Sequence, residues 1–362
     1  MLALWCLLMT AMAGTVTVEI LDVGQGDAIL IRSPEGKTVL IDAGTGRTDI
    51  VPMLQQRGLS ELNMVIGTHA HADHIGGMDE VFEAIAVKVY LDNGMPHTTK
   101  TYEKVMGLVE EKGIRYIEGK RDQEFNLGKE VTLQVLHPQN VLLRNTRSDL
   151  NSNSIVIKMT HGDNCFLFTG DAEEPTEHQL VQQGVGTCDV LKVAHHGSNH
   201  SSTNHFLKMV QPKIALISLG ANNRYGHPGE EAMSRLEQTG AEIYRTDTMG
   251  TITLTSDGKS LTVQTKKEDI VHKIDKGTVK EFAHTTTDTT VIADVNGKFD
   301  INTANQIQLE AINGIGPSKA ASIVAYRNEN GPFMSIQDVV KVSGIGPKTV
   351  EKIAVSAYVL AQ

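Results

Sequence analysis

The segment 68–77, which reads THAHADHIGG, constrains the fold more than any other part of this chain. It follows a short apolar run and holds four potential metal ligands within six positions: His69, His71, Asp73 and His74. Side chains two residues apart on an extended segment point the same way, so the first two histidines share one side. The turn then places the aspartate and the last histidine on the other side. Imidazole and carboxylate suit zinc, manganese or iron, whereas a structural zinc site is usually closed by cysteines. The loop therefore predicts an open site with ligands for two cations.

Two later strand ends supply further ligands. The apolar run 166–174, FLFTGDAEE, contains Asp171 just past its strand, where an open carboxylate can bridge two cations. The run 190–202, VLKVAHHGSNHSS, ends its strand at His195 and His196. Each feature alone is compatible with an ordinary turn, but the three segments together favour one shared site. We therefore expect two divalent metal ions, Zn²⁺ or Mn²⁺, as cofactors.

Short β-branched runs alternate with helical stretches from residue 14 to about residue 265, and this range predicts one α/β domain. Helices are expected to begin near Ile75 and Thr101. The expected strands are 15–23, 28–33, 37–44, 64–69, 87–92, 154–161, 164–171, 190–196, 214–220, 242–247, 251–258 and 260–265. These are too many strands for one open sheet. We therefore expect two mixed sheets that face each other, with helices outside.

The last third of the chain changes character. Residues 266–298 are polar with a Thr/Asp tract, and they predict a linker. Residues 299–362 are predicted to form a small helical domain that contains an internal repeat, GIGP-x-K, 30 residues apart. Thr303 is the expected start of its first helix. In each repeat the glycines let the backbone approach a phosphate, the isoleucine is buried, and the following proline opens a helix whose amides face the anion. The residues expected at these phosphate contacts are Gly314, Ile315, Gly316, Lys319, Gly344, Ile345, Gly346 and Lys348.

Composition limits how the chain meets other molecules. It has 33 basic and 43 acidic side chains in 362 residues, so no global positive field draws it to nucleic acid or to an anionic membrane. Between residues 300 and 362, five basic side chains balance five acidic ones. Binding of a nucleic-acid phosphate backbone by the tail would therefore rest on backbone amides and a few lysines, and would be sequence-independent and salt-sensitive. A helical module for protein interaction is the alternative for this tail.

The N-terminus and the cysteines bear on where the chain works. Residues 1–13 are mostly apolar and end in small residues, which predicts a signal peptide and a secreted or cell-surface protein. The apolar run has no preceding basic residue, so a buried first strand is the alternative. The run is shorter than a membrane span, and none is expected elsewhere. Cys6 would leave with the signal peptide, and Cys165 and Cys188 are expected to be buried free thiols rather than a bridge.

The order of these motifs resembles that of hydrolases with the metallo-β-lactamase fold: HxHxDH, a strand ending in GD, and a strand ending in HHGS. Within that group, the sequence is similar to the hydrolase domain of the ComEC family of bacterial DNA-uptake channel proteins, without their transmembrane portion. The similar segments are 21–44, 167–173, 189–198, 222–229 and 244–250. The resemblance implies the αββα sandwich, which agrees with the two-sheet expectation above.

The resemblance also implies roles for individual residues. The first metal would be held by His69, His71 and Asp171. The second would be held by Asp73, His74, Asp171 and His195, with Asp171 bridging and His196 competing for the last position. Asn153 would stand in as an oxygen ligand of the first metal, because His137 and His161 are poorly placed for that role. Asp42 would orient a ligand histidine from outside the metal shell, or would simply occupy a turn.

A dinuclear site of this kind activates water for attack on phosphorus or on a carbonyl carbon. Asp73 is expected to accept a proton, and His227, His196 and Lys192 are the candidates to assist the leaving oxygen. Asn223, Tyr225 and Ser198 are candidates for substrate contact, or for ordinary turn hydrogen bonds.

The tail resembles the tandem helix–hairpin–helix domain of the ComEA family of DNA receptors over 299–357. Together the two resemblances imply a secreted, dinuclear-metal phosphodiesterase that cuts DNA and is held on it by the tail. The alternatives are a phosphodiesterase for another substrate, such as phosphorylcholine, and a non-catalytic DNA-binding adaptor.

Overall fold

The structure is a computed structural model that describes residues 14–266, 272–274 and 299–359, apart from 303, 305–308, 311, 313 and 331–332. The chain divides into two compact units, Met1–Lys280 and Glu281–Gln362. The expected signal peptide and the expected helix start at Thr303 lie outside the described residues, as does most of the expected linker.

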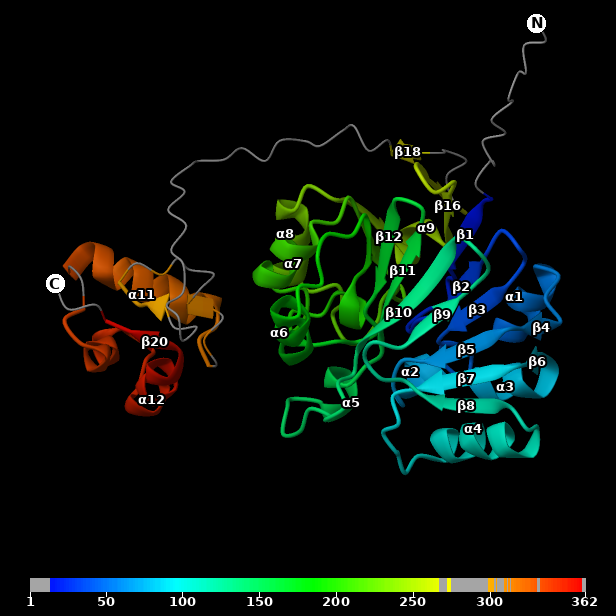
Figure 1. Cartoon of the computed structure of the whole chain (residues 1–362), viewed down its shortest axis with the longest axis horizontal. Helices are drawn as coiled ribbons and strands as arrows, with labels where there is room; N and C mark the ends of the chain where they lie inside the picture. The colour runs from blue at the N-terminus through cyan, green and yellow to red at the C-terminus, as the bar shows by residue number, and fades with distance from the viewer. Residues whose placement is uncertain are drawn as a thin grey trace, which may run out of the picture. The chain divides into compact units, whose positions relative to one another are not determined.

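Two mixed sheets form the first unit (Figure 1), as the sequence predicts. The nine-stranded sheet has the order β18 (His272–Ile274), β17 (Leu261–Thr265), β16 (Ile252–Ser256), β1 (Val16–Ile20), β2 (Ile29–Arg32), β3 (Thr38–Ile41), β5 (Met64–Gly67), β7 (Val89–Asp92) and β8 (Arg115–Glu118). The seven-stranded sheet has the order β15 (Glu242–Arg245), β14 (Ile214–Ile217), β13 (Val190–Lys192), β12 (Asn164–Phe168), β11 (Val156–His161), β10 (Val131–His137) and β9 (Glu124–Asn126). A parallel pair, β4 (Glu61–Leu62) and β6 (Ala86–Val87), lies beside the first sheet. Strand β18 lies within the stretch expected to be linker and extends the first sheet by antiparallel pairing with β17.

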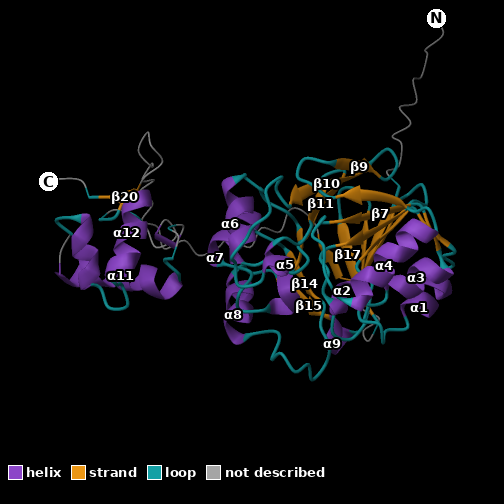
Figure 2. Cartoon of the chain, turned by 90° about the horizontal axis from the view of Figure 1, so that it is seen from below, coloured by secondary structure: helices purple, strands orange, loops and turns teal. Residues whose placement is uncertain are grey.

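Helices cover the outer face of each sheet (Figure 2), and this arrangement is the expected αββα sandwich. The helices against the nine-stranded sheet are α1 (Ile50–Gln56), α3 (Met78–Ala84) and α4 (Lys100–Glu111). Those against the seven-stranded sheet are α6 (Glu174–Gln182), α7 (Asn204–Val210) and α8 (Glu230–Gln238). Short helices lie in the connecting loops: α2 (Ala72–Ile75), α5 (Asp149–Ser152), η1 (Ala194–Gly197) and α9 (Thr246–Met249).

Burial follows the position of each strand. Strand β1 alternates buried and half-buried residues, whereas all five residues of the central strand β12 are buried, because its two faces meet the other sheet and the helices. The space between the sheets is filled by aliphatic side chains and by Phe166 and Phe168. This packing fixes the strand ends from which the site is built.

A disulfide joins Cys165 to Cys188, so the expectation of two free thiols is wrong. Strands β12 and β13 are parallel neighbours, with Phe166 opposite Val190. The cysteines lie at the start of this pairing, with Cα atoms 4.8 Å apart. The two cysteines are 23 positions apart in the sequence with α6 between them, which hides this proximity from sequence reasoning.

We expect the double substitution Cys165→Ala/Cys188→Ala to lower the free energy of unfolding by about 3 kcal/mol, because it frees a long loop in the unfolded chain. Urea unfolding measures the loss. Adding dithiothreitol should weaken the wild type by a similar amount and leave the double variant unaffected. Two titratable thiols in oxidised, denatured protein would contradict the pairing.

The second unit contains α11 (Pro317–Asn330), η2 (Ile336–Lys341) and α12 (Pro347–Ser356). Its first strand, β19 (Phe299–Asp300), pairs in parallel with β20 (Ala357–Tyr358), near the end of the described chain. Both repeat prolines open a helix, as expected, and Ile315 and Ile345 are buried in the core of the unit. Among the residues that the structure describes, no helix is long and apolar enough to span a membrane.

Candidate metal centre

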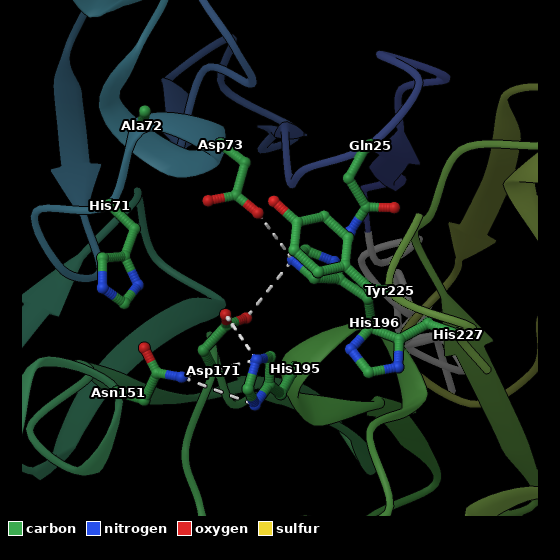
Figure 3. A pocket seen from close by; sticks show the side chains of 10 residues that line it. All are labelled: Gln25, His71, Ala72, Asp73, Asn151, Asp171, His195, His196, Tyr225 and His227. Atoms are coloured by element: carbon green, nitrogen blue, oxygen red, sulfur yellow. Dashed lines mark hydrogen bonds and ion pairs between the residues drawn. The ribbon is translucent and has the colours of Figure 1, made fainter. Parts of the chain in front are cut away.

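The ligand-type side chains meet where β5, β12 and β13 end, beside a pocket of about 320 Å³ (Figure 3). The chain reaches this edge from three distant segments, and Asp171 lies between the others in the close-up. The pocket is lined by Gln25, His71, Ala72, Asp73, Asn151, Asp171, His195, His196, Tyr225 and His227.

One group of ligand atoms surrounds Oδ1 of Asp171. This oxygen is 3.2 Å from Nε2 of His74 and 3.6 Å from Nε2 of His196. The same nitrogen of His196 is 3.4 Å from Oδ2 of Asp73. Atoms that bind one tetrahedral cation at about 2.1 Å lie about 3.4 Å from one another, so the spacing fits zinc or a similar ion.

Three atoms of this group lack hydrogen bonds within the described residues, although all three are buried. They are Nε2 of His74, Oδ1 of Asp171 and Nε2 of His196. Buried polar atoms without partners are costly, and a cation at their common centre would satisfy all three. The residues therefore fit a divalent metal ion.

A second group gathers on the other oxygen of Asp171. Oδ2 is 3.8 Å from Nε2 of His69 and 3.8 Å from Nε2 of His195, and Nε2 of His69 is 2.9 Å from Nδ1 of His71. Asp171 thus presents one oxygen to each group. This arrangement is the one that a bridging carboxylate requires.

The two adjacent histidines go to different groups, which differs from the sequence expectation. His196, expected only as a competitor, lies with Asp73 and His74, while His195 lies on the side of His69. Strand β13 ends at Lys192, and both histidines then adopt left-handed backbone with φ of 51° and 54°. This turn points the two side chains to different ligand groups. In a regular strand continued through His196, they would instead lie on opposite faces of the sheet.

Each buried imidazole is held by a partner on its other nitrogen. Nδ1 of His74 is 2.8 Å from Oδ2 of Asp42, and Nδ1 of His196 is 2.8 Å from the carbonyl oxygen of Ser218. Nδ1 of His69 is 3.1 Å from the Thr68 hydroxyl. Such contacts fix ring orientation and direct Nε2 toward the other ligand atoms.

Asp27 and Lys192 form a buried ion pair behind the site, at 2.6 Å, that the sequence analysis did not find. The other oxygen of Asp27 is 3.4 Å from Nδ1 of His196. Because Lys192 is fully buried and committed to Asp27, it cannot reach a leaving group in the pocket, and that candidate role is wrong. The two residues are 165 positions apart, so no local pattern joins them.

Asn151, rather than Asn153, reaches the pocket. The Asn153 side chain is fully used in local hydrogen bonds around α5. Its oxygen accepts from Leu143 N, and its nitrogen donates to the carbonyl oxygens of Leu143 and Asp149. The structure therefore does not bring Asn153 to the ligand cluster. The Asn151 amide lies 3.4 Å from the His195 ring, and its Oδ1 is buried without a hydrogen bond inside the described part of the chain.

Two other histidines lie outside the cluster, as expected. Nδ1 of His137 contacts the carbonyl oxygen of Ser154 at 3.0 Å, and Nδ1 of His161 contacts the Ser256 hydroxyl at 2.8 Å.

Among the candidates for substrate contact, Ser198 is buried, and its hydroxyl accepts a hydrogen bond from His200 N. The amide of Asn223 serves its own loop: it bonds the carbonyl oxygens of Gly220 and His227 and accepts from Tyr225 N. These two are structural, whereas Tyr225 and His227 line the pocket.

Comparisons with known proteins agree with this geometry. The family model described as the metallo-beta-lactamase superfamily matches residues 21–221, a span that includes the ligand-bearing loop, Asp171 and the histidine pair. The chain belongs to the metallo-beta-lactamase superfamily. A second model, the helix-hairpin-helix motif, matches residues 295–356.

"Competence protein ComA" of Neisseria gonorrhoeae is 32% identical over 240 residues, which are 65% of this chain and 31% of that protein. "ComE operon protein 3" of Bacillus subtilis (strain 168) is 32% identical over 256 residues, which are 65% of this chain and 32% of that protein. "Recombination protein 2" of Haemophilus influenzae is 32% identical over 242 residues, 65% of this chain and 28% of that protein. The tail is 57% identical over 60 residues to "ComE operon protein 1" of Bacillus subtilis, covering 17% of this chain and 29% of that protein. The chain thus spans about a third of the length of each relative.

The carboxylates of the metallo-beta-lactamase domain create a field that favours positive charge. Burial opposes protonation of His196, but Asp171, Asp27 and Asp73 outweigh it and raise the pKa of this imidazole to about 10. For Asp171, burial favours the acid form, yet His74, His196 and His195 hold its pKa well below the usual range. Without a cation, protonated imidazoles balance the negative charge of these carboxylates. Binding of a metal ion would therefore displace protons from the histidines.

The repeat glycines of the tail adopt the conformation that their hairpins need. Gly314 and Gly344 have φ of 88° and 84°, where a side chain would be strained. Gly344, Gly346 and Lys348 are exposed, and the half-buried Lys319 donates to the carbonyl oxygen of Gly314 at 3.1 Å. The exposed glycines and the helix starts that follow them leave backbone amides accessible to an anion.

Proposed function

We propose that this protein is an exported, metal-dependent phosphodiesterase that hydrolyses DNA and is held on its substrate by the C-terminal helix–hairpin–helix unit. One observation carries the proposal: a chain with a pocket-side cluster of ligand atoms at metal spacing also carries two glycine hairpins of the helix-hairpin-helix motif. The cluster supports hydrolysis, and the hairpins support a phosphate-backbone substrate.

The residues around the pocket would have distinct roles in metal binding and proton transfer. His69, His71 and His195, with one oxygen of Asp171, would hold one cation; Asp73, His74 and His196, with the other oxygen, would hold the second. Two bound cations supply Lewis acidity, lower the pKa of a water at the site, and stabilise negative charge developing on a phosphate. Asp73 is positioned to accept the proton of that water, because its side chain is partly exposed toward the pocket. His227 lines the pocket, and because burial lowers the pKa of its imidazole to about 4, its role toward a leaving oxygen would be that of a neutral hydrogen-bond donor.

The disulfide supports the exported location. Disulfides persist in oxidising compartments and are rare in a reducing cytosol. The bond between Cys165 and Cys188 lies at the start of the pairing of β12 and β13, the two strands whose other ends lead to Asp171 and to the two histidines. An oxidising location is therefore consistent with this bond.

The test is a cleavage assay with purified full-length protein on plasmid and on single-stranded and duplex oligonucleotides. We expect cleavage that EDTA abolishes and added Zn²⁺ or Mn²⁺ restores, together with two metal ions per chain by elemental analysis. RNA and a phosphorylcholine ester serve as alternative substrates in parallel. DNA binding without cleavage would favour the adaptor, and turnover of the phosphorylcholine ester alone would move the function to another phosphodiester.

A further inference from the structure

An ordered loop carries an exposed aromatic ring to the mouth of the pocket. Tyr225 is 52% exposed and lines the pocket, and the loop around it is fixed by the Asn223 amide. Single exposed tyrosines are common on protein surfaces, so exposure alone does not indicate a functional role. The position of this one, beside the ligand cluster, is informative.

Tyr225 continues a series of rings that begins at the cluster. Its ring is stacked on His227, with centroids 5.9 Å apart and 16° between planes. His227 in turn meets His195 edge-on, at 5.6 Å. The series therefore extends from a candidate metal ligand to solvent (Figure 3), and Tyr225 is the exposed last ring.

A cation accompanies this ring. The Arg224 guanidinium carbon is 5.2 Å from the Tyr225 centroid, and its Nη2 donates to the Tyr225 hydroxyl at 3.1 Å. Arg224 is exposed, so its remaining donors are accessible. A ring beside a guanidinium is the combination that binds a base together with its phosphate.

We infer that Tyr225 is a stacking platform for an unpaired nucleobase next to the scissile phosphate, with Arg224 contacting the adjoining phosphate. This inference rests on the proposed function and names its substrate class: single-stranded nucleic acid, or the frayed end of a duplex. In an intact duplex both faces of each base are already covered by neighbours, so a single ring at a pocket mouth cannot stack on it. Because every base has a π face, the platform does not select sequence.

Steady-state kinetics of full-length protein with a short oligothymidylate test the inference. We expect Tyr225→Leu to raise KM about tenfold, the order of one base–ring stack, with a much smaller change in kcat. Tyr225→Phe, which keeps the ring, should restore most of the loss. The same oligomer with abasic residues should respond far less to Tyr225→Leu. As a matched control, Tyr116→Leu removes an exposed tyrosine of β8 that lies outside the pocket, and should leave both constants unchanged.

A second readout is independent of catalysis. In EDTA, fluorescence anisotropy should show that Tyr225→Leu weakens binding of the thymidylate but changes binding of its abasic counterpart less. Equal losses on both oligomers, or none, would overturn the stacking role while leaving the nuclease proposal intact. Absence of metal-dependent cleavage of any DNA by the wild type would instead overturn the proposed function, and this inference with it.

Discussion

Asp171→Ala is expected to lower turnover of every phosphodiester substrate by about a thousandfold or more. Asp171 is the side chain whose two oxygens face the two ligand groups, with Oδ1 near His74 and His196 and Oδ2 near His69 and His195. Its removal takes a ligand from both cations at once and leaves a cluster of buried imidazoles without their shared carboxylate.

The measurement pairs kcat on a small phosphodiester with metal content. Asp171→Asn keeps the volume but loses the charge, and we expect it to bind fewer than two ions per chain. Glu174→Gln is the matched control, because it removes an exposed carboxylate three residues away. Circular dichroism verifies that each variant is folded. Wild-type turnover in folded Asp171→Ala would show that the assignment of two cations sharing this residue is wrong.

The sequence predicted most of the fold because its strands are short apolar runs that end at turns or polar residues. The two-sheet sandwich, the open loop at 68–77 and the buried hairpin isoleucines all follow from such local patterns. Strands β8, β9 and β10 were not predicted. Strands β8 and β9 present mostly exposed side chains, so their local pattern contains little apolar alternation. Strand β10 does alternate buried and half-buried residues, so its local pattern indicates a strand that the sequence analysis did not include.

The differences at the site, in contrast, depend on contacts between distant segments or on backbone angles. The divergence of His195 and His196 requires a left-handed turn that two histidines do not indicate by themselves. The Asp27–Lys192 pair and the disulfide each require knowledge of which strands are neighbours. The Asn153 amide is hydrogen-bonded within its own loop, whereas the Asn151 amide lies near His195.

Residue spacing was more informative about the ligand loop, because the geometry of this loop is set by neighbouring residues. The distances place His69 beside His71 and group Asp73 and His74 with His196, while His69 and His74 also lie close enough to share an ion with Asp171. What locates the centre between them is Asp171, which is brought in by β12 of the other sheet. The site is therefore a product of sheet-on-sheet packing, and its ligands cannot assemble before both sheets do.

Deleting residues 299–362 is expected to weaken binding to long DNA by about a hundredfold to a thousandfold at low salt, because several phosphate contacts are lost together. The first unit forms its own core, so it should remain folded and keep its rate on thymidine 5′-(p-nitrophenyl phosphate). The loss of affinity should shrink as salt rises, since salt already weakens the same contacts in the intact protein.

The full-length double variant Lys319→Gln/Lys348→Gln separates charge from the presence of the domain. It removes one ammonium group beside each hairpin while the glycines and the buried isoleucines stay in place. We expect a smaller loss of affinity than for the deletion, and a plot of log affinity against log salt that is shallower by about 2. Equal DNA affinity of the deletion and the full-length protein at low salt would assign the tail to protein interaction. A double variant with the wild-type salt slope would leave the backbone amides of the hairpins as the main contact with phosphate.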